Sequence, residues 1–189
     1  MRIAFWGEVH RCNTTTHMQA IADMLLAMCP DAWIVTGDLQ DIVTGALQKI
    51  EVEAEYCFLD CGTGLTARKR HMLFGADLVV VNLRQEHGCI RRFFEENPYM
   101  ARLCMARETL FILGGYECEA GIESAYLERV YRVESEPICG IPYNNEYHLA
   151  LAQGKNRAFI EREYREGTIR NEQFMNELQR IATWMIRRK

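Results

Sequence analysis

The feature that most constrains the fold is the alternation of short, nearly all-apolar runs with longer amphipathic segments. The run LVVV at 78–81 is the clearest example, because it offers no polar side chain to water. Strands of this kind are buried on both faces, as in a parallel sheet covered by helices. Such strands are joined by right-handed crossovers, which place ligands at their carboxyl ends. The sequence therefore predicts a three-layer α/β/α fold around a mostly parallel sheet.

The same pattern gives approximate bounds for the elements. The expected strands are 2–6, 32–36, 56–59, 78–83, 110–113 and 137–140. The expected helices are 15–28, 43–50, 67–74, 89–96 and 122–130. The tail 146–188 also has a helical pattern, with breaks near Gly154 and Gly167. We detect no repeat or linker, so we expect a single domain over 1–189.

Composition limits the class of protein. The chain has 189 residues, 49% of them hydrophobic, which suits one domain with a sizeable core. A net charge of -4 argues against a surface that coats nucleic acid generally. No stretch reaches the roughly 18 apolar residues of a membrane span. The first residues become polar too soon for a signal peptide, so we expect a cytoplasmic protein.

The cysteines have two interpretations. The chain has eight, and none forms a C-x-x-C pair. Most lie in apolar runs and are expected to be reduced core residues. The alternative is a zinc site that combines His10 and Cys12 with Cys57 and Cys61. No second closely spaced pair of ligands accompanies these residues, which favours the core interpretation.

The segment 8–16, EVHRCNTTT, lies between the first expected strand and the first expected helix. A loop in this position of a parallel α/β sheet commonly wraps phosphates, because its N–H groups and the helix N-terminus attract anions. The alternative is that the threonines only cap the helix and bind no ligand.

The loop resembles the deviant Walker A loop of MinD/ParA-type P-loop ATPases, K-G-G-x-G-K-T-T, in its length and closing threonines. Val9 stands at the signature lysine of that motif, and Thr14 stands at its P-loop lysine. His10, Arg11 and Asn13 replace its glycines. Thr15 and Thr16 keep the hydroxyl pair. The loop is therefore a degenerate Walker A.

The resemblance implies that ATP or ADP binds with Mg²⁺ at this loop. The implied phosphate-binding residues are Arg11, Asn13, Thr14, Thr15 and Thr16. Asn13 can adopt the left-handed conformation of a glycine at modest cost. Arg11 or His10 would have to supply charge in place of the lysine, which normally neutralises the β and γ phosphates.

Three further segments carry the resemblance. Residues 34–40 are similar to the D-x-D-x-Q segment of the family, which implies a catalytic role for Asp38. Residues 58–64 look like a Walker B strand, so Asp60 would hold Mg²⁺ together with Thr15. The alternative for Asp60 is a turn or helix-capping acid. Residues 139–144 resemble the I-P-x loop against the adenine, which makes Ile141 and Pro142 base contacts.

Two departures weaken the ATPase expectation. Gly114 stands where the family strand usually delivers a base-contacting asparagine. The segment between Asp38 and Asp60 is much shorter than in the family. We therefore expect a degenerate, noncatalytic or weakly nucleotide-binding protein that acts in partitioning or positioning through a protein partner. The alternative is an active ATPase with a rebuilt phosphate loop.

Other interactions stay open at this stage. The basic clusters at 68–71 and 91–92 are either a DNA-binding patch or solvated helix faces. The segment 184–189 is similar to the membrane-targeting helix of MinD, but the apolar stripe before it favours packing on the sheet. A homodimer is compatible with the resemblance. The nucleotide-sandwich dimer of the family needs the signature lysine, which Val9 cannot replace.

Overall fold

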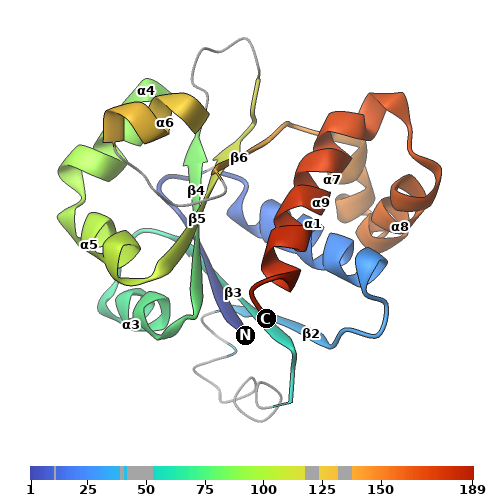
Figure 1. The fold of residues 1–189 in the computed structure, drawn as a ribbon, viewed down its shortest axis with the longest axis horizontal. Helices are drawn as coiled ribbons and strands as arrows, with labels where there is room; N and C mark the ends of the chain where they lie inside the picture. The colour runs from blue at the N-terminus through green and yellow to red at the C-terminus, as the bar shows by residue number, and fades with distance from the viewer. Residues whose placement is uncertain (11, 39–40, 42–52, 118–123, 132–137) are drawn as a thin grey trace.

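The centre of the protein is a parallel sheet in the order β2-β3-β1-β4-β5-β6 (Figure 1). The computed structural model describes residues 1–10, 12–38, 41, 53–117, 124–131 and 138–189. The strands are β1 Arg2–Gly7, β2 Ile34–Asp38, β3 Tyr56–Thr63, β4 Leu78–Arg84, β5 Glu108–Gly114 and β6 Ile138–Ile141. Every ladder is parallel, so all carboxyl ends meet at one edge, as the apolar runs predict.

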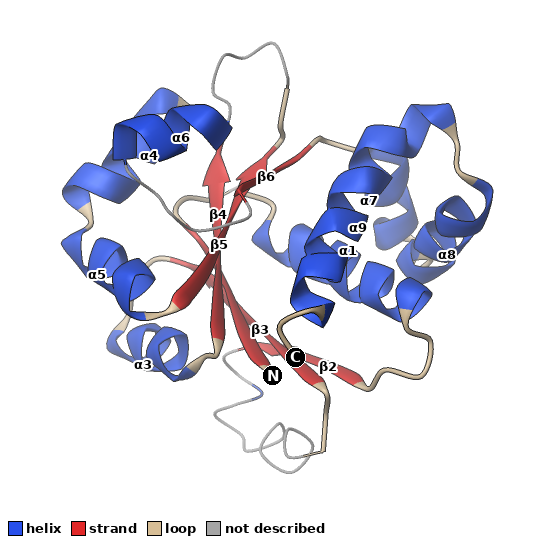
Figure 2. Cartoon of the chain, in the orientation of Figure 1, coloured by secondary structure: helices blue, strands red, loops and turns tan. Residues whose placement is uncertain are grey.

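Helices cover both faces of the sheet, which confirms the three-layer architecture (Figure 2). On one face lie α1 Thr14–Met28, α7 Asn145–Ala152, α8 Asn156–Glu166 and α9 Glu172–Ile186. On the other lie α3 Ala67–Gly75, α4 His87–Arg91, a π-helical turn Arg92–Glu96, α5 Pro98–Ala106 and α6 Ser124–Tyr131. A short 3-10 turn, Ile169–Asn171, precedes α9.

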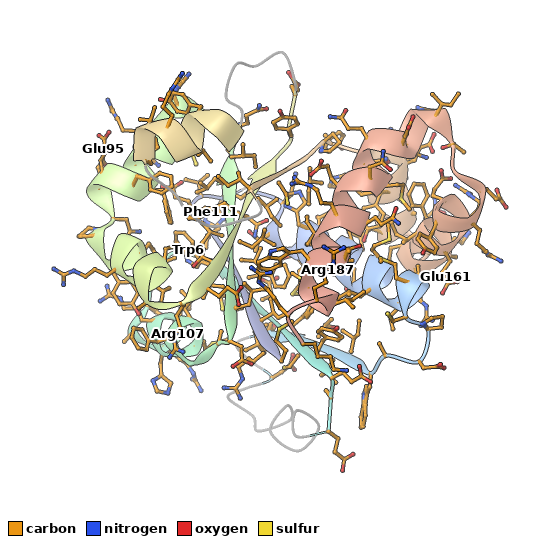
Figure 3. The ribbon with its side chains drawn as sticks, viewed as in Figure 1. Trp6, Glu95, Arg107, Phe111, Glu161 and Arg187 are labelled. Atoms are coloured by element: carbon orange, nitrogen blue, oxygen red, sulfur yellow. The ribbon has the colours of Figure 1, made fainter. Side chains whose placement is uncertain are left out.

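The alternation of side chains along the strands produces two apolar layers. Ile3 and Phe5 of β1 face α1 and α9, whereas Ala4 and Trp6 face the α3–α6 side. Figure 3 shows Trp6 and Phe111 in this second layer, where both rings pack near Phe93, at 6.0 and 5.7 Å between centroids. β1 is therefore buried on both sides, as the apolar runs require.

Most predicted elements are present, with shifted bounds. β3 continues to Thr63, four residues beyond the predicted end at 59, because its pairing with β1 extends to the Gly7–Thr63 register. The predicted helix 43–50 lies outside the described residues. The sequence analysis does not predict α5. This helix begins at Pro98, and the side chain of Asn97 caps it by accepting the Met100 N–H, but a proline obscures a helix in the sequence.

The tail folds as three helices, and the predicted breaks are confirmed. Gly154 and Gly167 both have positive φ, 67° and 63°, at the ends of α7 and α8. The predicted stripe of α9 is buried in the core next to β6 and α1; it consists of Phe174, Leu178, Ile181 and Met185. Packing on the sheet is thus the observed role of this helix. Within the described residues, no helix has the length and apolarity needed to cross a membrane.

We expect Leu178→Ala to lower the free energy of unfolding by about 2–5 kcal/mol, because Leu178 is fully buried and truncation leaves a cavity. Gln179→Ala, at the exposed neighbouring position, should change it by less than about 0.5 kcal/mol. Urea denaturation followed by circular dichroism measures both. Equal effects of the two substitutions would contradict the packing of α9 described above.

Candidate functional site

The loop after β1 begins α1 with an unusual backbone turn. Asn13 is the N-cap of α1 and has φ 57°, the left-handed conformation; its side chain makes no capping hydrogen bond. Asparagine is one of the few non-glycine residues that adopt this conformation at modest cost. Asn13 therefore supplies the backbone turn expected from the glycine it replaces. The threonines lie inside the first turn of α1, so the simple helix-cap alternative does not describe them.

Thr15 and Asp60 meet at the carboxyl edge of the sheet. Thr15 Oγ1 donates a hydrogen bond of 2.5 Å to Asp60 Oδ2. The second oxygen, Asp60 Oδ1, accepts the Gly62 N–H at 2.8 Å, so the carboxylate is held in one orientation. A hydroxyl beside a carboxylate is the type of oxygen pair that Mg²⁺ binds in phosphate sites. The donor set fits the implied cation, and Thr15 and Asp60 are the residues that would hold it.

A cavity of about 410 Å³ adjoins Thr15 of this pair. Its lining residues are Val9, His10, Cys12, Asn13, Thr14, Thr15, Thr16, Gly62 and Thr63. The volume falls in the range of roughly 300–1,000 Å³ that small-molecule sites occupy. His10 lines the cavity and does not fill it, whereas Arg11 lies outside the described residues. The first N–H groups of α1, which lack intrahelical acceptors, belong to the residues in this wall.

The cavity lies at the switch point of the sheet. The connection after β1 leads through α1 on one face, and the connection after β3 leads through α3 on the other (Figure 1). Adjacent strands whose connections diverge leave a crevice at their carboxyl ends, where α/β proteins bind ligands. The cavity position thus follows from the topology.

Side-chain contacts of Cys12, Cys89 and Glu8 hold the described residues of the loop before Asn13. Val9 N donates to Cys12 Sγ at 3.4 Å, and Cys89 Sγ donates to Glu8 Oε2 at 3.1 Å. The contact between the two thiols lowers the pKa of Cys12 and, together with burial and Glu8, raises the pKa of Cys89. Arg92 lies 3.7 Å from the other oxygen of Glu8. These contacts turn the Glu8 carboxylate toward α4.

The zinc interpretation gains no support. Cys57 and Cys61 are buried in the apolar layer on the α3 side, as the core interpretation predicts. Burial raises the pKa of Cys61 to about 12, which disfavours the thiolate that zinc requires. The described residues contain no group of three or more His, Cys, Asp or Glu side chains arranged around a common point.

A buried polar cluster beneath the loop escaped the sequence reading. His17 Nδ1 lies 2.8 Å from Asn82 Oδ1, and Asn82 Nδ2 donates to Trp6 O at 3.4 Å. The side-chain nitrogen of Asn82 donates to Trp6 O, so the side-chain oxygen of Asn82 is left to accept a hydrogen bond. Its donor is the Nδ1–H of a neutral His17. A Cβ at Gly114 would lie 2.8 Å from His17 Cε1 and 2.9 Å from Cys12 O. No side chain fits there without a shift of the backbone, which explains why a glycine stands at position 114.

The remaining predicted site residues lie farther from the cavity. Asp38 pairs in register with Asp60, but its carboxylate accepts the Asp41 N–H at 3.1 Å, and it is not part of the cavity wall. Ile141 and Pro142 lie at the end of β6, at the edge of the sheet. The side chain of Ile141 is buried in the core, and its carbonyl accepts the Tyr116 N–H at 3.0 Å. Of the predicted site residues that the structure describes, Asn13, Thr14, Thr15 and Thr16 line the cavity and Asp60 is bonded to Thr15, whereas these three do not line it.

Both basic clusters contact their own protein. On α3, Arg70 lies over the Tyr99 ring at 4.9 Å, and Lys69 Nζ donates to Thr63 O. Beyond α4, Arg92 pairs with Glu8, and Arg91 lies 4.0 Å from Glu95. These contacts match the solvated-face interpretation of each cluster more closely than an open DNA-binding patch.

No protein-family model and no curated protein sequence matches the chain. Solved structures do match in fold. MinD from Pyrococcus horikoshii OT3, complexed with Mg-ADP, gives a TM-score of 0.73 at 13% identity, covering 97% of this chain and 95% of that one. A ParA family ATPase from Chlorobium tepidum TLS gives 0.71 at 12%, covering 96% and 98%. MinD from the MinC:MinD complex of Aquifex aeolicus gives 0.69 at 11%, covering 98% and 96%.

These likenesses establish the fold class. The chain has the P-loop fold of MinD and ParA ATPases over nearly its whole length. The loop that the sequence analysis singles out lies between β1 and α1 of this fold. The likeness in fold accompanies sequence identities of 11–13%.

Burial of His17 produces a pH dependence of stability. Burial lowers its pKa to about 4, from 6.5 in the unfolded chain, and His148 adds a smaller repulsion. Below pH 6.5 the unfolded chain binds the proton more readily, so stability is complete above that pH and falls as the pH approaches 4. The loss should reach about 3 kcal/mol. Denaturant titrations between pH 4 and 7.5 measure it.

The control for this pH dependence is His17→Gln, which removes the titrating group and keeps a donor for Asn82 Oδ1. The variant should lose most of the slope between pH 4 and 6.5. An unchanged slope would assign the pH dependence to other groups.

Proposed function

We propose that this protein binds ATP or ADP with Mg²⁺ at the cavity between β1 and α1, and hydrolyses it slowly or not at all. The observation that carries this proposal is the hydrogen bond from Thr15, a residue of the cavity wall, to Asp60. A hydroxyl beside a carboxylate supports this choice of site, because a phosphate-bound Mg²⁺ takes oxygen ligands of both kinds. The fold supports the choice of ligand, because the matching Pyrococcus MinD is complexed with Mg-ADP.

The wall of the cavity supports binding more than hydrolysis. Its backbone turn at Asn13 and the first turn of α1 suit an anion. However, Thr14 stands in place of the lysine. The Thr14 side chain packs back against β1, because its hydroxyl occupies the space that a Cβ on Gly7 would need. Removal of one preorganised electrostatic group commonly costs about 2.7–4 kcal/mol in the transition state. Ground-state binding, which draws on many contacts, tolerates such a loss better.

Asp38 adds to the case against efficient turnover. Its carboxylate accepts from Asp41 N, and its own N–H donates to Asp41 Oδ2 at 2.9 Å. These two hydrogen bonds hold Asp38 next to Asp41, outside the cavity wall. We therefore favour a nucleotide-binding protein that acts in partitioning or positioning through a protein partner, as MinD is found with MinC in the Aquifex complex. A working ATPase with a rebuilt loop is the alternative.

Calorimetric titration with ATP and Mg²⁺ tests the proposal. Thr15→Ala and Asp60→Ala should each weaken binding by about tenfold or more, because each removes an oxygen near the metal. Thr36→Ala, on the exposed face of β2, and Asp31→Ala, before that strand, are matched controls and should bind as the wild type does.

Phosphate release measured on the same samples separates the two functions. Release at the rate of buffer alone supports the noncatalytic function. Turnover that disappears in both Thr15→Ala and Asp60→Ala would establish the ATPase instead. Absence of binding at millimolar nucleotide would exclude both and leave an interaction scaffold.

A further inference from the structure

The described wall of the cavity contains neither a lysine nor an arginine. Among its described lining residues, His10 is the one whose side chain can become cationic, and it is exposed to solvent. A di- or triphosphate carries several negative charges, and Asp60, which accepts a hydrogen bond from Thr15 of the cavity wall, adds another. A cation from a neighbouring element would therefore matter more here than in a loop with its own lysine.

Lys69 brings an ammonium group to this wall from α3. Its Nζ donates a hydrogen bond of 2.5 Å to the carbonyl of Thr63, which lines the cavity. A Cβ built on Gly62, the adjacent lining residue, would lie 3.6 Å from the same Nζ. The backbone N–H of Gly62 also donates a hydrogen bond to the Asp60 carboxylate. The ammonium thus lies beside the two residues that form the β3 side of the cavity.

The local structure holds Lys69 in this place. Thr66 caps α3 by accepting the backbone N–H of Lys69 at 3.3 Å. The preceding loop is tied to β1, because Trp6 Nε1 donates to Gly64 O at 2.9 Å. Gly64 and Gly62 both have positive φ, 72° and 57°, which lets the chain turn tightly between β3 and α3. The position of the lysine is therefore set by the folded backbone and not by a surface rotamer alone.

We propose that Lys69, supplied from α3, makes the cationic contact to the nucleotide phosphates that no lysine or arginine of the described cavity wall provides. An ammonium has three N–H donors, so Lys69 can hold the Thr63 carbonyl and a phosphate oxygen together. The inference rests on the proposed nucleotide binding. It adds that phosphate binding draws on a residue of α3.

The test compares Lys69→Gln with Arg68→Gln. Arg68 is the exposed residue before Lys69 on α3, and Arg68→Gln removes one positive charge, as Lys69→Gln does. Calorimetry with ATP, ADP and adenosine, each with Mg²⁺, measures the affinities. Lys69→Gln should weaken ATP and ADP binding by about tenfold or more, as expected for a hydrogen bond to a charged group. It should leave adenosine unchanged, Arg68→Gln should stay within about twofold, and Lys69→Arg should restore most of the affinity.

The outcomes separate this inference from the function on which it rests. If the wild type binds ATP and Lys69→Gln binds it equally well, the lysine inference is overturned and nucleotide binding stands. Equal losses in Lys69→Gln and Arg68→Gln, or a parallel loss for adenosine, would also overturn it, since either result reports general charge or structure. If the wild type binds no nucleotide, both fail. Thermal unfolding checks each variant, and Lys69→Met takes the place of an unfolded Lys69→Gln.

Discussion

The pairing of β1 with β3 and β4 is the interaction on which the site depends. β1 lies inside the sheet and is buried from Ile3 to Gly7, so its register with both neighbours is set by the core. That register places Phe5 opposite Asp60 and Gly7 opposite Thr63. The two strands therefore end side by side, and the helices that follow them leave toward opposite faces. The cavity is a consequence of this divergence, and the loop residues only shape its wall.

The loop shows that the left-handed backbone turn before α1 can form without a glycine. Asn13 takes the left-handed conformation, and the thiols of Cys12 and Cys89 with Glu8 hold the chain before it. The one glycine that sterics demand on β1 is Gly7, which makes room for the Thr14 hydroxyl. Geometry and charge are thus separable: these contacts retain the turn, but they supply no lysine to the cavity.

Much of the fold was accessible from the sequence because it follows from local patterns. The all-apolar runs identified the buried strands, and the stripe on α9 identified the helix that covers the sheet. Thr15 and Asp60 were found as a pair because each ends or follows a recognisable strand. The helix α5 was missed because Pro98 and its short length obscure it. His17 was missed because its partner Asn82 lies on another strand, and no spacing rule connects the two.

Lys69 was missed for a different reason: the sequence shows it inside a basic cluster whose members are chemically alike. Only the capped start of α3 and the glycine turn before it direct this side chain to the Thr63 carbonyl, while Arg70 of the same cluster lies over Tyr99. A cluster of like charges therefore divides into separate roles once the backbone orients its members. Composition alone gives an average over them.

The element that carries the cation has consequences for binding and for chemistry. A lysine in the first turn of α1 would belong to a helix with many core residues, including Ile21, Met24 and Leu25. Lys69 belongs to α3, whose buried residues are Met72 and Leu73. A cation held beside the cavity by α3 would contact the phosphate in the ground state and in the transition state alike. Such uniform binding lowers the dissociation constant without accelerating the chemical step. The proposed contact therefore suits nucleotide binding without rapid cleavage of phosphate.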